Sequence, residues 1–99
     1  MIKVVWSKRS LQELDEILEY WLKRNKSNTY PNRILKESNI AVNLIRTQAN
    51  VGLETNHRNV KMRLILNRFY LVYRINRDEI EILKFWDCRQ DPKSNKYLK

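Results

Sequence analysis

The chain has 99 residues, 31% of them charged, and a net charge of +9. This length suffices for one compact domain, which we expect over residues 1–99, and the composition is not that of a disordered chain. Cys88 is the only cysteine and His57 the only histidine, which excludes an intrachain disulfide and argues against a Cys/His zinc site; we expect no metal or other cofactor. Apolar runs are too short for a signal peptide or a membrane span, so a cytoplasmic protein without a membrane partner is expected.

The first half of the chain predicts a strand followed by two helices. Residues 2–6 are β-branched and aromatic, as is typical of a strand. Apolar residues then recur every three or four positions, which predicts a helix over residues 7–24 with Ser7 as its N-cap. A polar connection at residues 25–29 leads to a second helix with Pro31 in its first turn. The two apolar stripes are Leu11, Leu14, Ile17, Leu18, Trp21 and Leu22, and Ile34, Ile40, Ala41, Leu44 and Ile45.

The second half predicts a loop and three strands. Residues 48–59 are expected to form the loop, and any backbone position with a positive φ is expected at Gly52, the only glycine. Asn67 and Arg68 separate two strand-like runs by the two residues of a hairpin turn. The predicted strands are residues 60–66, 69–75 and 79–86, and residues 93–99 form a polar, basic tail.

This order of elements predicts an α+β fold, β-α-α-β-β-β, with an αα-hairpin packed on one face of a mainly antiparallel sheet. Neighbouring side chains in a strand point to opposite faces, and apolar and basic residues alternate in residues 60–64. An open face that carries cations suits an anionic ligand or an acidic protein segment. We expect Val60, Met62, Leu64 and Leu66 to face the helices, and Lys61, Arg63 and Ile65 to lie on the open face.

Several local motifs accompany this order of elements. They are the opening strand with Trp6, the helix at residues 7–17, the pair Arg63 and Leu64, and residues 70–75, 80–83 and 85–92. Together these features resemble the RelE/ParE superfamily of bacterial type II toxins over nearly the whole chain. The resemblance implies a small toxin that a cognate antitoxin holds inactive. RelE-like members are metal-independent endoribonucleases that cut mRNA on the ribosome, whereas ParE-like members inhibit DNA gyrase without a recognised active site.

A RelE-like activity would need a group of catalytic side chains. Metal-free RNA cleavage uses the 2′-hydroxyl as nucleophile, so the protein must supply a proton acceptor, a proton donor and cations for the developing phosphorane charge. Our candidates for the cations are Lys61, Arg63 and Arg89, and the resemblance matches Tyr97 with the C-terminal tyrosine of many RelE-like nucleases. The alternative is that the three cations are ordinary solvated charges and that Tyr97 packs on the edge of the sheet.

Acidic residues around Arg89 depart from the nuclease pattern. Asp87 and Asp91 alternate with this arginine and weaken its attraction for phosphate. Either carboxylate could serve as the base, or could pair with Arg89 to fix the turn. His57 is a conceivable acid or base, and an exposed loop histidine without a role is the alternative.

Three functions follow from these observations. The first hypothesis is a type II toxin that acts as a RelE-like, ribosome-dependent mRNA endoribonuclease. The alternatives are a ParE-like inhibitor of DNA gyrase, and a non-toxic basic module that binds nucleic acid. The expected partner is a cognate antitoxin, together with the ribosome and mRNA in the first case and DNA gyrase in the second.

Overall fold

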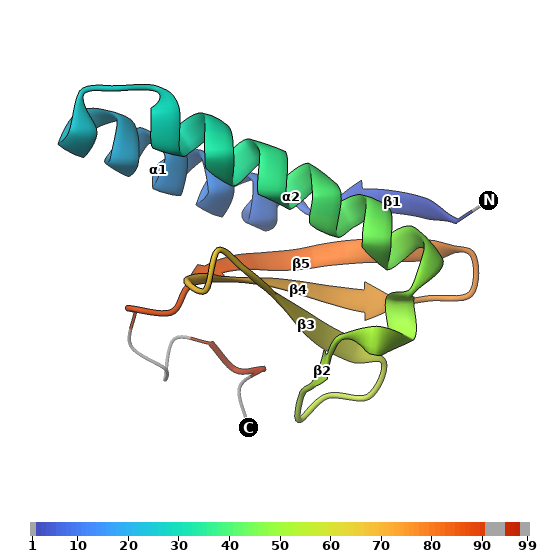
Figure 1. Ribbon diagram of the computed structural model, residues 1–99. Coiled ribbons are helices and arrows are strands. Elements are labelled where there is room, and N and C mark those ends of the chain that lie inside the picture. The colour runs from blue at the N-terminus through green and yellow to red at the C-terminus, as the bar shows by residue number, and fades with distance from the viewer. Residues whose placement is uncertain (1, 91–94, 98–99) are drawn as a thin grey trace.

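The computed structural model describes residues 2–90 and 95–97, and in it two helices joined as a hairpin cover one face of a five-stranded sheet (Figure 1). The strand order is β1-β5-β4-β3-β2, with β1 parallel to β5 and the other pairs antiparallel. This confirms the predicted α+β class and element order. The elements are β1 Lys3–Trp6, α1 Lys8–Asn25, α2 Thr29–Thr47, the 3₁₀ turn η1 Ala49–Val51, β2 Leu53–Glu54, β3 Val60–Ile65, β4 Phe69–Ile75 and β5 Glu79–Asp87.

The two helices begin where the sequence predicts. The Ser7 hydroxyl accepts a hydrogen bond from the Ser10 backbone N–H at 3.0 Å, which confirms Ser7 as the N-cap of α1. Pro31 lies in the first turn of α2, where a missing N–H removes no helical hydrogen bond. The apolar stripes are only partly covered, because Leu11 and Ile40 remain 47% and 45% exposed. The helices therefore keep apolar surface after they pack on the sheet.

The hairpin between β3 and β4 turns one residue earlier than predicted. Leu66 and Asn67 have φ angles of 55° and 54°, and the Arg68 N–H donates to the Ile65 carbonyl at 3.1 Å. Two successive positive φ angles are typical of a type I′ turn, whose twist matches that of the strands. The expectation of a positive φ at Gly52 is wrong, since its φ is −64°. Tertiary context imposes the left-handed conformation on other residue types instead.

Gly52 is needed for a close approach of the chain rather than for a turn. A Cβ atom at this position would overlap the hydroxyl of Tyr73 and would lie 3.0 Å from the Met62 carbonyl oxygen. That hydroxyl donates a 2.7 Å hydrogen bond to the Ala49 carbonyl, which attaches η1 to the centre of the sheet. The absence of a side chain at residue 52 therefore positions the segment between α2 and β2.

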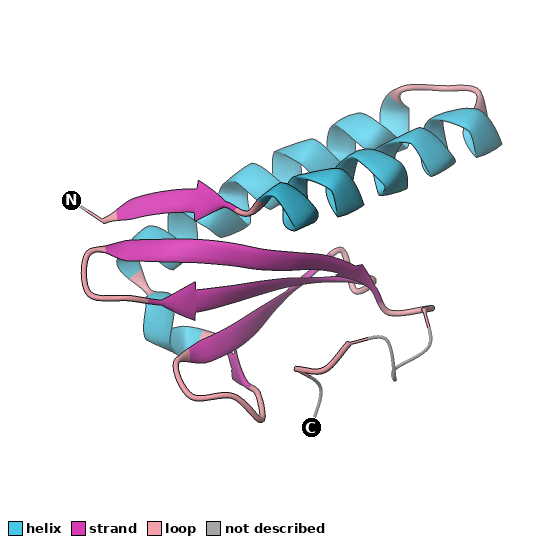
Figure 2. Cartoon of the chain, turned by 180° about the vertical axis from the view of Figure 1, so that it is seen from behind, coloured by secondary structure: helices cyan, strands magenta, loops and turns pink. Residues whose placement is uncertain are grey.

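Apolar side chains cover both faces of the sheet, so the expectation of an open face is wrong. The helix-side core includes Ile65 and the fully buried Phe69, Leu71, Tyr73, Ile80 and Ile82. A second cluster on the other face holds Val60, Met62, Val72 and Tyr97. Figures 1 and 2 show the described part of the C-terminal segment on the side of the sheet away from the helices.

The side chains of β3 consequently have the opposite orientation to the one predicted. Val60 and Met62 point away from the helices, and Ile65 points toward them. Strand alternation tells which residues share a face, but it does not tell which of two apolar faces the helices cover. A bulge in β5 also breaks the alternation there, because Val72 pairs with Lys84 while Tyr73 pairs with Ile82.

Gly52→Ala is expected to destabilise the protein by about 1–3 kcal/mol, because the added methyl group must displace the Tyr73 hydroxyl. In a Tyr73→Phe background the same change should cost less, since the colliding hydroxyl is absent. Urea unfolding of the single and double variants measures the difference. Val51→Ala is the control and should stay within about 0.5 kcal/mol, because Val51 is 67% exposed. Equal penalties for Gly52→Ala in both backgrounds would contradict this account.

Candidate functional site

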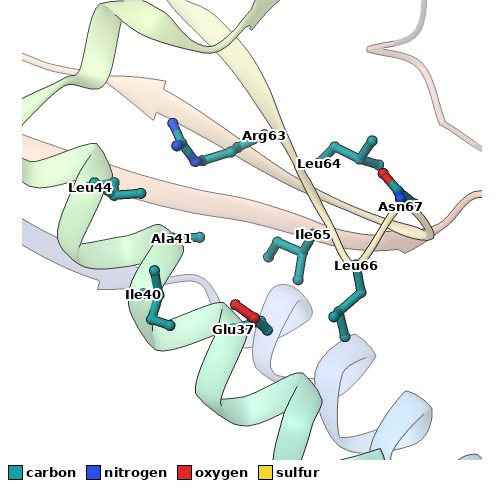
Figure 3. Close-up of a pocket in the computed structure, with 9 residues that line it drawn as sticks. All are labelled: Glu37, Ile40, Ala41, Leu44, Arg63, Leu64, Ile65, Leu66 and Asn67. Carbon is teal, nitrogen blue, oxygen red and sulfur yellow. The ribbon is translucent and has the colours of Figure 1, made fainter.

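Lys61 and Arg63 lie on the helix side of β3, so their predicted placement on the face opposite the helices is wrong. Lys61 pairs across the ladder with Tyr73, which belongs to the helix-side core. Arg63 lies on the same side, because it pairs with Leu71 of the helix-side core. Burial raises the pKa of Tyr73, and the nearby Arg63 guanidinium opposes this rise. Figure 3 shows Arg63 and Ile65 on the side of β3 that faces α2, with Leu64 pointing away. Both cations are partly exposed, because α2 does not extend over the whole of β3.

Tyr97 packs against the opposite face of the sheet. Its side chain is 7% exposed and belongs to the cluster of Val60, Met62 and Val72. The phenol ring meets the His57 ring edge-on, with centroids 4.8 Å apart, and the Tyr97 N–H donates to the Asn95 side chain at 3.1 Å. Tyr97 therefore packs on the sheet, as the alternative expected, but on a face rather than at the edge. The sheet separates it from Lys61 and Arg63.

Arg89 lies in the turn after β5, where Asp87 holds it. The Asp87 carboxylate accepts a hydrogen bond from the Arg89 backbone N–H at 2.9 Å and pairs with its guanidinium at 3.3 Å. The pairing that fixes this turn is confirmed, and the carboxylate raises the pKa of Arg89. The guanidinium also lies over α1, with its Cζ 5.2 Å from the Trp21 ring centroid. Asp91, the second acidic candidate, lies outside the described residues.

The four predicted catalytic residues occupy three separate places. Lys61 and Arg63 share the helix side of β3, Arg89 lies beyond the end of β5, and Tyr97 lies under the other face. Within residues 2–90 and 95–97, no hydrogen bond or ion pair joins any two of them. The fold does not assemble them around one phosphate-sized space.

The remaining reactive groups give no alternative centre in the described part of the chain. No cluster of three His, Cys, Asp or Glu side chains there could hold a metal ion. Burial and the neighbouring Asp87 raise the pKa of the Cys88 thiol, so it stays protonated near neutral pH and is a weak nucleophile. None of the helices described is long and apolar enough to cross a membrane.

A groove runs between α2 and the turn of the β3–β4 hairpin (Figure 3). Its volume is about 380 Å³, and six of its nine lining residues are apolar, among them Ile40, which is 45% exposed. Arg63 and Glu37 are its charged residues. The other lining residues are Ala41, Leu44, Leu64, Ile65, Leu66 and Asn67. A surface groove that combines apolar residues with polar and charged groups is typical of a surface that binds another protein.

The outer edge of β3 beside this groove is open. β2 pairs only with Lys61 and Met62, and among the described residues no strand pairs with the outer edge of Arg63–Ile65. Unpaired N–H and C=O groups at such an edge accept an additional strand. The groove and the edge together form a site that fits an extended or helical peptide.

The edge of β5, by contrast, is occupied by side chains of α1. The Glu13 carboxylate accepts hydrogen bonds from the Phe85 N–H at 3.1 Å and from the Lys84 ammonium at 2.7 Å. The Ser10 hydroxyl donates to the Ile82 carbonyl at 3.1 Å. These side chains continue the pairing where β1 ends, so this edge offers no strand-binding surface.

Comparison with known proteins identifies the family. The sequence model of the ParE toxin of type II toxin–antitoxin systems, parDE, matches residues 4–92. The chain belongs to the ParE toxin family. This confirms its membership of the RelE/ParE superfamily and makes it a toxin of the type II toxin–antitoxin class.

The fold of this ParE-family toxin is also similar to a solved structure. A chain from the chromosomal ParDE toxin–antitoxin system of P. aeruginosa superposes with a TM-score of 0.68 at 19% sequence identity. The match covers 88% of this chain and 96% of that chain. No functionally curated protein matches the sequence.

The sequence analysis missed a group of arginines around Trp21 in this toxin. Trp21 was expected only as a core residue of α1, which its 8% exposure confirms. Arg24 and Arg68 were not considered, yet both guanidinium groups lie within 6 Å of its ring centroid. Arg24 follows Trp21 by three positions on α1, a spacing that places both on one side of the helix and could have been read from the sequence. No spacing links Arg68 to Trp21, because Arg68 comes from a distant segment that meets α1 only in the folded chain.

Glu13→Ala is expected to destabilise the toxin by about 2–4 kcal/mol, because it leaves the Lys84 ammonium, 9% exposed, without its carboxylate and the Phe85 N–H without its acceptor. Glu13→Gln keeps an acceptor and should cost less. Glu16→Ala, at an exposed site of the same helix, is the control and should change stability by less than about 0.5 kcal/mol. Thermal or urea unfolding measures all three, and a Glu13→Ala variant as stable as the control would contradict the bridging role.

Proposed function

We propose that this ParE-family toxin inhibits DNA gyrase by binding it, and that a cognate antitoxin blocks the toxin by covering the α2–β3 groove. The observation that carries the proposal is the separation of Lys61, Arg63, Arg89 and Tyr97 into three places. Metal-free RNA cleavage needs an acid, a base and cations within hydrogen-bond reach of one phosphate, about 3 Å. Inhibition by binding needs no such convergence.

The state of the individual side chains also favours binding over catalysis. Tyr97 is enclosed by Val60, Met62 and Val72, so its hydroxyl would have to leave a packed cluster to reach RNA. Asp87 is engaged by Arg89 through two hydrogen bonds, which lowers its value as a base. These contacts stabilise the fold, and they engage the side chains that a nuclease would need for catalysis.

The cations that the sequence analysis selected keep a role in this proposal as binding residues. Lys61 and Arg63 are partly exposed on one strand and can contact an acidic protein surface or DNA held by the target. The net charge of +9 speeds encounter with such partners by electrostatic steering. We expect the two residues to contribute affinity for gyrase rather than a chemical step.

The proposed antitoxin site is the groove with the open edge of β3. An acidic, amphipathic segment could place apolar side chains against Ile40 and Leu44 and a carboxylate near Arg63. The unpaired edge of Arg63–Ile65 lies beside it and can add main-chain hydrogen bonds. The similarity in fold to a chain from a ParDE toxin–antitoxin system is consistent with this arrangement.

Expression of the toxin without its antitoxin is expected to stop growth, and the purified protein should inhibit DNA supercoiling by gyrase while ribosome-bound mRNA stays intact. Lys61→Ala combined with Arg63→Ala should raise the half-inhibitory concentration roughly tenfold, because two charged contacts are lost. Arg77→Ala, an exposed site on the β4–β5 turn, is the matched control. Cleavage of mRNA at defined codons together with normal supercoiling would refute gyrase inhibition and restore the ribonuclease hypothesis.

Ile40→Glu is expected to weaken antitoxin binding at least about tenfold, because it places a carboxylate in the apolar wall of the groove and repels an acidic segment. Leu35→Glu is the matched control: Leu35 is 40% exposed on the same helix and is not among the lining residues of the groove. Calorimetric titration of both variants with the antitoxin gives the two affinities. Equal losses for the two variants would show that the groove is not the docking site.

A further inference from the structure

Three arginines from different segments surround one tryptophan at the end of the molecule where α1 ends. Their Cζ atoms lie 4.9 Å (Arg68), 5.2 Å (Arg89) and 5.9 Å (Arg24) from the centroid of the Trp21 ring, all within the range of cation–π contacts. Arg24 is in the last turn of α1, Arg68 follows the β3–β4 turn and Arg89 follows β5. The Cys88 N–H donates to the Arg68 carbonyl at 2.8 Å, which holds the last two segments together.

Trp21 itself carries a buried donor that has no acceptor. Its side chain is 8% exposed, and its Nε1 atom has no hydrogen-bond partner among the described residues. Buried indole N–H groups normally find a partner, so an acceptor is missing at this point. Tyr20 and Tyr30 pack edge-on against the ring, with centroids 5.2 Å and 4.9 Å away. The enclosed ring leaves no free face on which a nucleic-acid base could stack.

The positive charge around Trp21 is only partly balanced. Asp87 pairs with Arg89, but within the described residues no carboxylate lies at ion-pair distance from Arg24 or Arg68. Arg24 is exposed and Arg68 is partly exposed, so both guanidinium groups are accessible to an anion of a partner. An anion bound beside them would gain charged donors and could also accept the indole N–H.

The space beside Trp21 continues from the proposed antitoxin groove. A hollow of about 490 Å³ is lined by Trp21, Asn25, Tyr30 and Arg68, and it shares Leu66 and Asn67 with the groove between α2 and β3. A peptide that occupies the groove and continues past the β3–β4 turn would arrive at Arg68. The position of Arg68 therefore matches the path of the proposed antitoxin segment.

We infer that the site formed by Trp21 with Arg24, Arg68 and Arg89 binds an aspartate or glutamate side chain of the antitoxin. This inference rests on the proposed neutralisation by an antitoxin. Guanidinium forks bind carboxylates with two parallel hydrogen bonds, and the indole N–H supplies one more donor. A single carboxylate fits better than the phosphates of a nucleic acid, because Glu16 and Asp87 line the neighbouring hollow and repel a repeating polyanion. The site anchors one end of the antitoxin segment.

The test uses the full toxin and, as the probe, its purified cognate antitoxin. Arg68→Gln and Arg24→Gln should each weaken binding roughly tenfold in calorimetry, whereas Arg77→Gln, on the β4–β5 turn, should stay within about twofold. In ¹H–¹⁵N spectra the Trp21 indole signal should shift downfield when the antitoxin binds, as a new hydrogen bond requires. Melting curves confirm that each variant is folded. One Asp→Asn or Glu→Gln change in the antitoxin should weaken binding to the unmodified toxin but add little to the loss of affinity that Arg68→Gln already causes.

The possible results separate the two claims. Unchanged affinity in both arginine variants, with a stationary Trp21 signal, overturns the carboxylate site and leaves groove binding intact. Arginine variants that lose affinity for a DNA duplex but keep that for the antitoxin assign the site to nucleic acid, which also overturns the inference. Failure of the unmodified toxin to bind its antitoxin overturns this inference and the proposed neutralisation together.

Discussion

Burial of β4 and β5 on both faces is the constraint from which the other features of this toxin follow. Phe69, Leu71 and Tyr73 are completely buried on the helix side, while Val72 is completely buried on the other side beneath the C-terminal segment. The enclosed part of these strands has no room for a polar site, because an unpaired polar group there would lose its hydration without compensation. Polar side chains on the sheet, such as Lys61, Arg63 and the ion pair of Arg74 with Glu81, lie where this cover ends.

The short outer strands β1 and β2 leave part of β5 and part of β3 uncovered, and these two stretches differ. Along β5, beyond the end of β1, the Glu13 carboxylate accepts from the Phe85 N–H and the Ser10 hydroxyl donates to the Ile82 carbonyl. Along β3 the short strand β2 covers two residues, and the edge beyond them stays open beside an apolar groove. Exposed edges and exposed apolar surface both favour association, so a toxin with such a site gains stability and solubility from a partner that covers it.

The cations lie in separate groups, which supports the proposal that this toxin acts by binding. Lys61 and Arg63 are on one strand, and Arg24, Arg68 and Arg89 gather around Trp21 at the end of α1. Separate groups of this kind can contact separate parts of a large macromolecular partner, whereas catalysis requires several groups at one reacting atom. The same arrangement explains why a basic chain with plausible catalytic residue types lacks an assembled centre in its described part.

Local patterns in the sequence determined the elements of this protein: helical periodicity, the Ser7 cap, the strand runs and their order were enough to predict the fold class and the family resemblance. Tertiary structure alone decided which face of β3 the helices cover, because Val60, Met62 and Ile65 are all apolar and alternation cannot rank two buried faces. It also decided where the residues of the predicted site lie. Tyr97 packs under the sheet and the arginines meet at Trp21 because segments distant in the chain come together there, and no spacing between residues encodes that meeting.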